Sequence, residues 1–102
     1  MIFLINVTTI ITIKYFFDPA KDESNINKHG ISLCEAKLLE WDVALSWIDI
    51  RKDYGEVRYV SLVAMKHRLY CVVYVDIKLS RKIISLRKAN LREIDKYEEE
   101  ID

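Results

Sequence analysis

The basic residues of this chain are concentrated in one segment, whose charge suits a partner that carries phosphate groups. Residues 66–92 contain eight Lys or Arg and a single acid, Asp76, whereas residues 93–102 contain six acids and one base, Lys96. The formal net charge of the whole chain is zero, so the total hides this division. A local positive field beside a negative tail carries information about binding partners rather than about the fold.

The densest part of the basic segment is Arg81–Ala89, which reads R-K-I-I-S-L-R-K-A. If it forms a regular strand, residues of equal parity share a face. One face is then expected to carry Arg81, Ile83, Ser85 and Arg87, and the core-facing side to carry Ile84 and Leu86. A guanidinium group binds two phosphate oxygens at once, so the arginine-bearing face predicts recognition of phosphate. The alternative is a solvated strand edge whose charges keep the protein soluble.

A further arginine, Arg58, interrupts an apolar segment with the sequence E-V-R-Y-V. A strand is a rigid element, and it holds a side chain in the fixed position that a binding or catalytic site requires. We therefore expect Arg58 to join Arg81 and Arg87 around one phosphodiester. The alternative for Arg58 is simple exposure on the outer face of the sheet.

A Lys28–His29 pair stands where one predicted helix ends, in the stretch N-I-N-K-H-G-I-S. Cations in the last turn of a helix interact favourably with its C-terminus, by about 0.3–1 kcal/mol, and this explains a basic pair without any chemistry. It does not explain why one of the two is histidine. Because histidine exchanges protons near neutral pH, Lys28 or His29 is also the candidate proton carrier of a catalytic site.

The remaining polar residues give weaker signals. Asp49 and Asp53 are isolated carboxylates near a predicted turn, and we expect both to be solvated. Tyr97 lies on the apolar side of the last predicted helix, which favours a core role over an orienting role in a site. The histidines and cysteines lack the spacing of zinc ligands, and the sequence contains no GxGxxG, P-loop or HExxH motif. We therefore predict no metal and no other cofactor.

The elements that must position these residues begin with an unusual N-terminus. Residues 1–13 read M-I-F-L-I-N-V-T-T-I-I-T-I, which is rich in β-branched residues and alternates like a half-buried strand. The apolar run is interrupted and is too short to span a membrane. We expect an N-terminal extension with an extra strand in residues 1–13, followed by a strand from about Thr12 to Phe17. Residues 14–102 are expected to form a single domain.

Two helices are predicted to follow the N-terminal strands. Asp18-Pro19 is a strong start for a helix that runs to His29, and Gly30 suits the left-handed position after its end. The sequence S-L-C-E fits a capping box that starts a second helix at Ser32 and continues to about Trp41.

Strands and one more helix complete the predicted order. The strand candidates are joined by short turns, which imply an antiparallel meander, and they span residues 44–51, 57–65, 69–77 and 81–88. Asn90 then caps a final helix with Glu93 at its third position. The predicted fold is α+β, with two N-terminal helices and a C-terminal helix packed on a curled, mainly antiparallel sheet of four to five strands.

Three blocks of the sequence resemble the BrnT toxins of bacterial type II toxin–antitoxin pairs, which belong to the wider group of RelE-like ribonucleases. Phe17–Lys21 resembles the family's opening F-x-W-D-x-x-K, with Phe17 in place of the Trp. Asn25–Ala36 is similar to N-x-x-K-H-G-[VI]-S-F-x-E-A. Arg81–Ala89 is similar to R-x-I-I-S-A-R-x-A, with Leu86 in place of the common Ala. Both substitutions are apolar for apolar and affect packing more than chemistry.

Single residues extend the resemblance over most of the chain, from about Tyr15 to Tyr97. Arg58 matches an arginine that precedes an apolar strand, and Glu93 and Tyr97 fit the E-x-x-x-Y of the last helix. The resemblance implies a RelE-like toxin domain over residues 14–102. It also implies an endoribonuclease of the mRNA interferase type, which acts in the cytoplasm, cleaves RNA without a metal and inhibits translation.

The resemblance also implies partners. The toxin is neutralised by a cognate ribbon-helix-helix DNA-binding antitoxin, and the complex, for which a heterotetramer is one candidate, contacts DNA only through the antitoxin. RNA is the substrate and no membrane is involved. On this interpretation the phosphate is bound by Arg58, Arg81 and Arg87, and the proton carrier is Lys28 or His29. Two other classes stay open: a binding module for RNA or protein without catalysis, and a basic surface that serves solubility alone.

Overall fold

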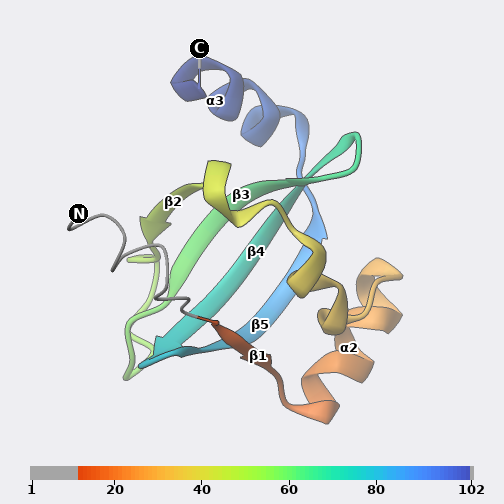
Figure 1. The fold of residues 1–102 in the computed structure, drawn as a ribbon, viewed down its shortest axis with the longest axis vertical. Helices are drawn as coiled ribbons and strands as arrows, with labels where there is room; N and C mark the ends of the chain where they lie inside the picture. The colour runs from red at the N-terminus through yellow and green to blue at the C-terminus, as the bar shows by residue number, and fades with distance from the viewer. Residues whose placement is uncertain (1–11, 102) are drawn as a thin grey trace, which may run out of the picture.

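Five strands form one curled sheet in the computed structural model, which describes residues 12–101 (Figure 1). Helices lie beside one edge of this sheet, against one of its faces and at one of its ends. In chain order the elements are β1 (Lys14–Phe16), α2 (Pro19–His29), η1 (Leu33–Leu38), η2 (Trp41–Val43), β2 (Leu45–Ile48), β3 (Tyr59–Met65), β4 (Arg68–Ile77), β5 (Ser80–Lys88) and α3 (Leu91–Ile101), where η denotes a 3-10 helix. The predicted α+β class is confirmed.

The strand order in the sheet is β1-β5-β4-β3-β2, and β2 to β5 form the predicted antiparallel meander. Lys66 and Lys78 adopt positive φ angles of 59° and 56° at the two tight turns on either side of β4. The short β1 is added in parallel to the outer edge of β5, where Tyr15 pairs with Arg81. The sheet is therefore mixed but mainly antiparallel, as predicted.

The helix α2 begins and ends as its sequence predicts. Asp18 is the N-cap, and its carboxylate accepts a backbone N–H two residues further on at 2.9 Å, with Pro19 between them. Gly30 ends the helix with a φ of 72°, a left-handed conformation that glycine adopts at little cost. These local signals place Lys28 and His29 in the last turn of α2.

The second predicted helix is wrong in type: the chain forms two short 3-10 helices, η1 and η2, instead of one α-helix. Leu33, Ala36 and Leu39 are buried at intervals of three residues. A 3-10 helix has three residues per turn, so it brings these side chains into one row facing the sheet. Ser32 caps η1 as predicted, and the Asp22 carboxylate of α2 accepts the backbone N–H of Leu33 at 2.7 Å.

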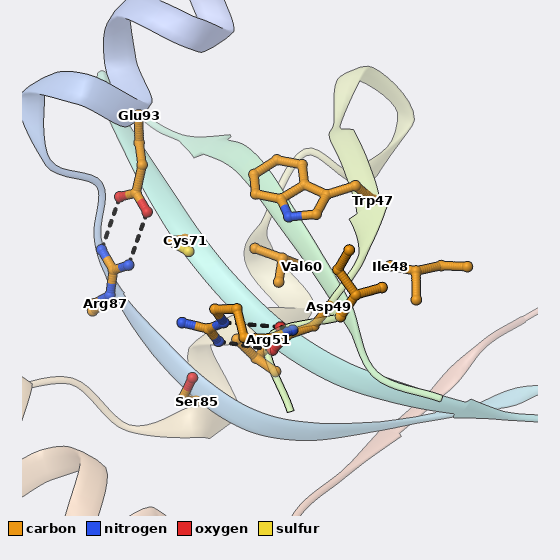
Figure 2. A pocket seen from close by; sticks show the side chains of 11 residues that line it. Trp47, Ile48, Asp49, Arg51, Val60, Cys71, Ser85, Arg87 and Glu93 are labelled. Atoms are coloured by element: carbon orange, nitrogen blue, oxygen red, sulfur yellow. Dashed lines mark hydrogen bonds and ion pairs between the residues drawn. The ribbon is translucent and has the colours of Figure 1, made fainter. Parts of the chain in front are cut away.

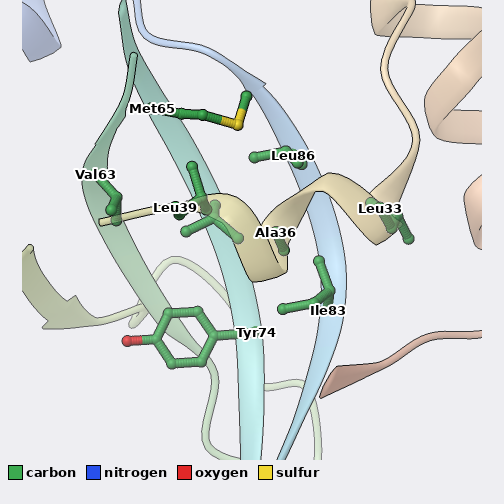
Figure 3. Close-up of a cluster of buried hydrophobic side chains, with 9 residues drawn as sticks. Leu33, Ala36, Leu39, Val63, Met65, Tyr74, Ile83 and Leu86 are labelled. Atoms are coloured by element: carbon green, nitrogen blue, oxygen red, sulfur yellow. The ribbon is translucent and has the colours of Figure 1, made fainter. Parts of the chain in front are cut away.

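The main hydrophobic core lies between η1 and one face of the sheet, which we call the covered face (Figure 3). Its buried side chains are Leu33, Ala36, Leu39, Val63, Met65, Val72, Tyr74, Ile83 and Leu86. Burying a leucine-sized side chain stabilises the fold by about 1.5–3 kcal/mol, so this layer holds the sheet in place. The opposite face, which we call the groove face, carries a smaller cluster against which Ile94 and Tyr97 of α3 pack. The predicted core role of Tyr97 is therefore confirmed.

Asn25 fastens α2 to the free edge of β5, beyond the point where β1 stops. Its Nδ2 donates to the carbonyl of Leu86 at 2.7 Å, and its Oδ1 accepts the N–H of Leu86 at 3.1 Å. Nδ2 also donates to the carbonyl of Ile31 at 2.9 Å, after the end of α2. The side-chain amide thus supplies the hydrogen bonds that a neighbouring strand would make at this edge. Asn25 is only 5% exposed. It fixes the position of α2, and therefore of Lys28 and His29, relative to β5.

We expect Asn25→Ala to lower the free energy of unfolding by about 2–4 kcal/mol, because it leaves three backbone groups without partners, two of them buried and one partly buried. Urea unfolding followed by circular dichroism measures the change. Asn27→Ala, at an exposed position of the same helix, is the matched control and should stay within about 0.5 kcal/mol of wild type. A cost below about 1 kcal/mol for Asn25→Ala would contradict the role assigned to the amide.

The last helix, α3, starts with the predicted reciprocal cap. The N–H of Glu93 donates to Asn90 Oδ1 at 2.8 Å, and the N–H of Asn90 donates to Glu93 Oε1 at 2.9 Å. No residue of α3 is fully buried, and Leu91 is 79% exposed. The cap therefore contributes to holding α3 at the end of the sheet, and it sets the position of the Glu93 carboxylate.

Part of the predicted N-terminal structure lies outside the described residues. The extra strand expected in residues 1–13 falls there, except for Thr12 and Ile13, which precede β1. The strand predicted from about Thr12 to Phe17 is shorter, Lys14–Phe16. No helix within residues 12–101 is both long enough and apolar enough to cross a membrane.

Candidate functional site

The two arginines of β5 lie on opposite faces of the sheet, and the prediction that they share a face is wrong. Val73 pairs with Ser85 and the next residue, Tyr74, pairs with Ile83, so the register shifts and Ile84 is an extra residue, a β-bulge. The bulge reverses the alternation of side chains. Ile83 therefore faces the same core as Leu86, three residues away, and Ser85 points to the groove face.

Arg81 is held on the covered face by structural contacts. Its Nε and Nη2 donate to the Asp76 carboxylate at 2.7 and 3.0 Å. Its guanidinium carbon lies 4.5 and 4.4 Å from the ring centroids of Trp41 and Tyr74. Only 15% of the side chain is exposed. An ion pair and two cation–π contacts therefore fix Arg81 away from the face that carries Arg87.

The groove face has a hollow that we call the groove, bounded by the end of β2, by β5 and by the start of α3 (Figure 2). It is lined by Trp47, Ile48, Asp49, Ile50, Arg51, Val60, Cys71, Val73, Ser85, Arg87 and Glu93. Val60 and Cys71 belong to the small apolar cluster of this face. Burial raises the pKa of the Cys71 thiol to about 11, so this part of the lining is uncharged at neutral pH.

Arg87 stands at one side of the groove and is oriented by α3. Its Nη1 and Nη2 donate to the two Glu93 oxygens at 2.9 and 2.8 Å, and Nη1 also donates to the Lys88 carbonyl at 3.2 Å. This pairing raises the pKa of Arg87 and lowers the pKa of Glu93, so both groups are charged at neutral pH. Within residues 12–101, Nε and the second hydrogen of Nη2 have no protein partner, which leaves one two-donor edge open.

Arg51 stands at the other side of the groove and is not among the arginines predicted for the site. Its Nε and Nη2 donate to Asp49 at 2.8 and 2.7 Å (Figure 2). The prediction that Asp49 is solvated is wrong, because its side chain is only 1% exposed. Asp49 also accepts the backbone N–H of Arg51 and the Tyr54 hydroxyl, both at 3.1 Å. A buried carboxylate with these partners holds the guanidinium in place.

Arg58 lies beside the groove and not in its lining. Its Nε donates to Glu56 at 3.1 Å, and its guanidinium carbon lies 4.3 Å from the centre of the Tyr54 ring. The hydroxyl of the same tyrosine donates to Asp49, the carboxylate that holds Arg51. Arg58 therefore contacts the groove residues only indirectly, through Tyr54. The predicted meeting of Arg58, Arg81 and Arg87 at one phosphate therefore does not occur in this structure.

Lys28 and His29 lie next to the bulge of β5. Together with Lys21, Ser24 and Asn25 they surround a small hollow whose other wall is Ile84 and Ser85. Ser85 also lines the groove, so this residue borders both hollows. The structure thus places Lys28 and His29 at the edge of β5 beside Ser85, two residues before Arg87 in the same strand.

The arrangement combines the groups that phosphodiester chemistry needs. Arg87 and Arg51 offer charged donors, which bind phosphate oxygens more strongly than neutral donors do. Lys28 and His29 offer exchangeable protons at the neighbouring edge of β5. Of the five residues predicted for the site, Arg87 lines the groove, and Lys28 and His29 border the hollow that shares Ser85 with the groove. Arg58 and Arg81 do not line either hollow. The pattern D-x-R at Asp49 and Arg51 was the local signal for the missed arginine.

Comparison with known proteins agrees with the sequence blocks described above. A family model described as a ribonuclease toxin, BrnT, of a type II toxin–antitoxin system matches residues 17–93. This span contains Lys28, His29 and every residue that lines the groove. No curated protein matches the chain.

Proposed function

Because the chain belongs to the BrnT family of ribonuclease toxins of type II toxin–antitoxin systems, we propose that it is an endoribonuclease whose active site is the groove together with Lys28 and His29. The observation that carries this proposal is that Arg87 has an open edge with two donors in the groove. The hollow next to the groove is bordered by Lys28 and His29, the two residues in the last turn of α2 that can exchange a proton. The reaction we propose is metal-independent cleavage of mRNA in the cytoplasm, which inhibits translation.

The proposed reaction uses the nucleophile that RNA itself supplies, the 2′-OH. This oxygen attacks the adjacent phosphorus and gives up its proton to His29 or Lys28. Arg87 binds the non-bridging oxygens and stabilises the charge that develops on the phosphorane. The bond from phosphorus to the 5′-oxygen then breaks, and that oxygen takes up a proton from the residue that accepted the 2′-OH proton or from water. The products are a 2′,3′-cyclic phosphate and a 5′-hydroxyl.

The roles of the other two predicted arginines change in this proposal. Arg81 fixes the aromatic cluster of the covered face through Trp41 and Tyr74, and it does not contact the substrate. Arg58 supports Tyr54, whose hydroxyl helps to hold Asp49. The fold is proposed to be of the RelE-like type. The partner is proposed to be a ribbon-helix-helix DNA-binding antitoxin, which links the toxin to DNA indirectly and forms a heterotetramer with it.

Product analysis tests the proposal directly. Purified protein and a defined RNA are incubated with EDTA, and the new ends are identified by mass spectrometry. We expect fragments that end in a 2′,3′-cyclic phosphate and begin with a 5′-hydroxyl. The same oligonucleotide with deoxyribose 5′ of the cleaved bond is the control, and it should stay intact because it lacks the nucleophile. RNA that is bound but not cleaved would instead support a binding module without catalysis.

A further inference from the structure

Two arginines face the groove, and each is held by its own carboxylate through a different edge. Arg87 uses the Nη1 and Nη2 edge towards Glu93, which leaves the edge formed by Nε and Nη2. Arg51 uses the Nε and Nη2 edge towards Asp49, which leaves the edge formed by Nη1 and Nη2. No protein group within residues 12–101 occupies either remaining edge. The groove therefore offers two separate guanidinium forks, each suited to two oxygens of one phosphate.

The support behind Arg51 is stronger than a solubilising surface charge needs. Asp49 is almost fully buried and receives four hydrogen bonds, whereas 72% of the Arg51 side chain is exposed. The hydrogen bonds from Arg51 hold the pKa of Asp49 well below its usual range, so the carboxylate stays charged. A buried charge costs free energy unless it is paired, and here the pairing aims an exposed guanidinium into a groove.

The two forks come from opposite parts of the sheet. Arg87 belongs to β5, whereas Arg51 lies in the loop three residues after the end of β2. β2 and β5 are separated by β3 and β4, which places their backbones about 14 Å apart at the usual strand spacing. Both side chains line one groove, and the charge of Arg51 acts to lower the pKa of Arg87. The lining of the same groove includes Val60, Val73 and Trp47, whose apolar side chains suit a ribose and a base.

We propose that Arg51 binds a second phosphate of the RNA chain, next to the phosphate that Arg87 holds, so that the groove takes a single-stranded segment with two consecutive phosphates. The inference rests on the proposed function, because it names the substrate segment of that same site. Asp49 is then a positioning residue that keeps the fork of Arg51 turned to the second phosphate.

Binding of short 2′-O-methyl oligonucleotides tests this inference, because they lack a free 2′-OH and are not cleaved. Wild type and variants are titrated by NMR with a dinucleotide that has one phosphate and a trinucleotide that has two. For wild type we expect about tenfold tighter binding of the trinucleotide. Arg51→Met should remove this ratio and change the dinucleotide Kd by less than about threefold. Lys52→Met, which removes an exposed charge from the same loop, should keep the ratio.

A second variant covers the case in which Arg51→Met does not fold. Arg51→Lys keeps a cation beside Asp49, but an ammonium has no second edge for a phosphate, so it should also lose the ratio. A ratio retained in Arg51→Lys, or a loss of equal size for both probes, would overturn the inference. If wild type distinguishes the probes but cleaves no RNA, the ribonuclease proposal fails and the two-phosphate site stands. If wild type cleaves RNA and the variants keep the ratio, the ribonuclease proposal stands and the two-phosphate site fails.

Discussion

Arg87→Met is expected to lower kcat/KM for RNA cleavage by about 10²–10³-fold. Removing one preorganised donor that stabilises transition-state charge costs on the order of 3–4 kcal/mol in other enzymes. Arg87 is such a donor, because Glu93 holds it through two hydrogen bonds and leaves its other edge open towards the groove. Methionine keeps much of the length and apolar contact of the side chain but carries no donor. Initial rates with a defined RNA measure the effect.

Arg81→Met is the matched control, since both arginines belong to β5 and both pair with a carboxylate. Its side chain lies on the covered face against Trp41, so it should change kcat/KM by less than about threefold while lowering thermal stability. Rates are compared only at temperatures where circular dichroism reports each variant as folded. Equal losses of activity in the two variants would contradict the separation of the arginines by the bulge. They would support a phosphate site shared by both faces of the strand.

Local signals predicted the ends of the helices well. Asp18, Gly30 and Asn90 act within a few residues of their own position, and the structure has each in the expected capping role. The antiparallel meander likewise follows from short turns between strands, which leave little choice of topology. The sequence therefore predicted where Lys28 and His29 lie along the chain and that one strand carries Arg81 and Arg87. Arg58, which was expected within a strand, lies just before β3.

One non-local feature, the β-bulge in β5, separated the predicted arginines and could not be predicted from strand periodicity. The bulge depends on the register between β4 and β5, and only the burial of both Ile83 and Leu86 in one core reveals it. Because the period of side chains along a strand is two, a single extra residue moves Arg87 to the face opposite Arg81. Regular alternation would have kept both arginines together, and so the predicted cluster was wrong.

Asp49 shows a limit of a different kind. Its partners Arg51 and Tyr54 lie within five residues, so the contacts are local, but its burial is a property of the folded chain, in which its side chain is 1% exposed. An isolated acid near a turn is usually solvated, and nothing in composition distinguishes this one. The pattern D-x-R-x-x-Y supplied the hydrogen-bond partners, and only the tertiary structure showed that the carboxylate needs them.

His29→Gln is expected to lower kcat by about 10²–10⁴-fold, the usual contribution of a positioned proton carrier. Imidazole takes up and releases a proton near neutral pH, and His29 borders the hollow that shares Ser85 with the groove. Glutamine keeps a polar side chain of similar size, but it cannot accept the 2′-OH proton. Initial rates of RNA cleavage at saturating substrate measure the change in kcat.

Lys28→Met separates catalysis by His29 from a general effect of charge at the end of α2. Both residues occupy the last turn, and both contribute to the helix C-terminus by about 0.3–1 kcal/mol, so a structural role alone predicts similar and small changes for the two variants. With His29 as the base, Lys28→Met loses less than about tenfold in kcat. If Lys28→Met loses more kcat than His29→Gln does, the lysine carries the proton and the assignment to His29 is wrong.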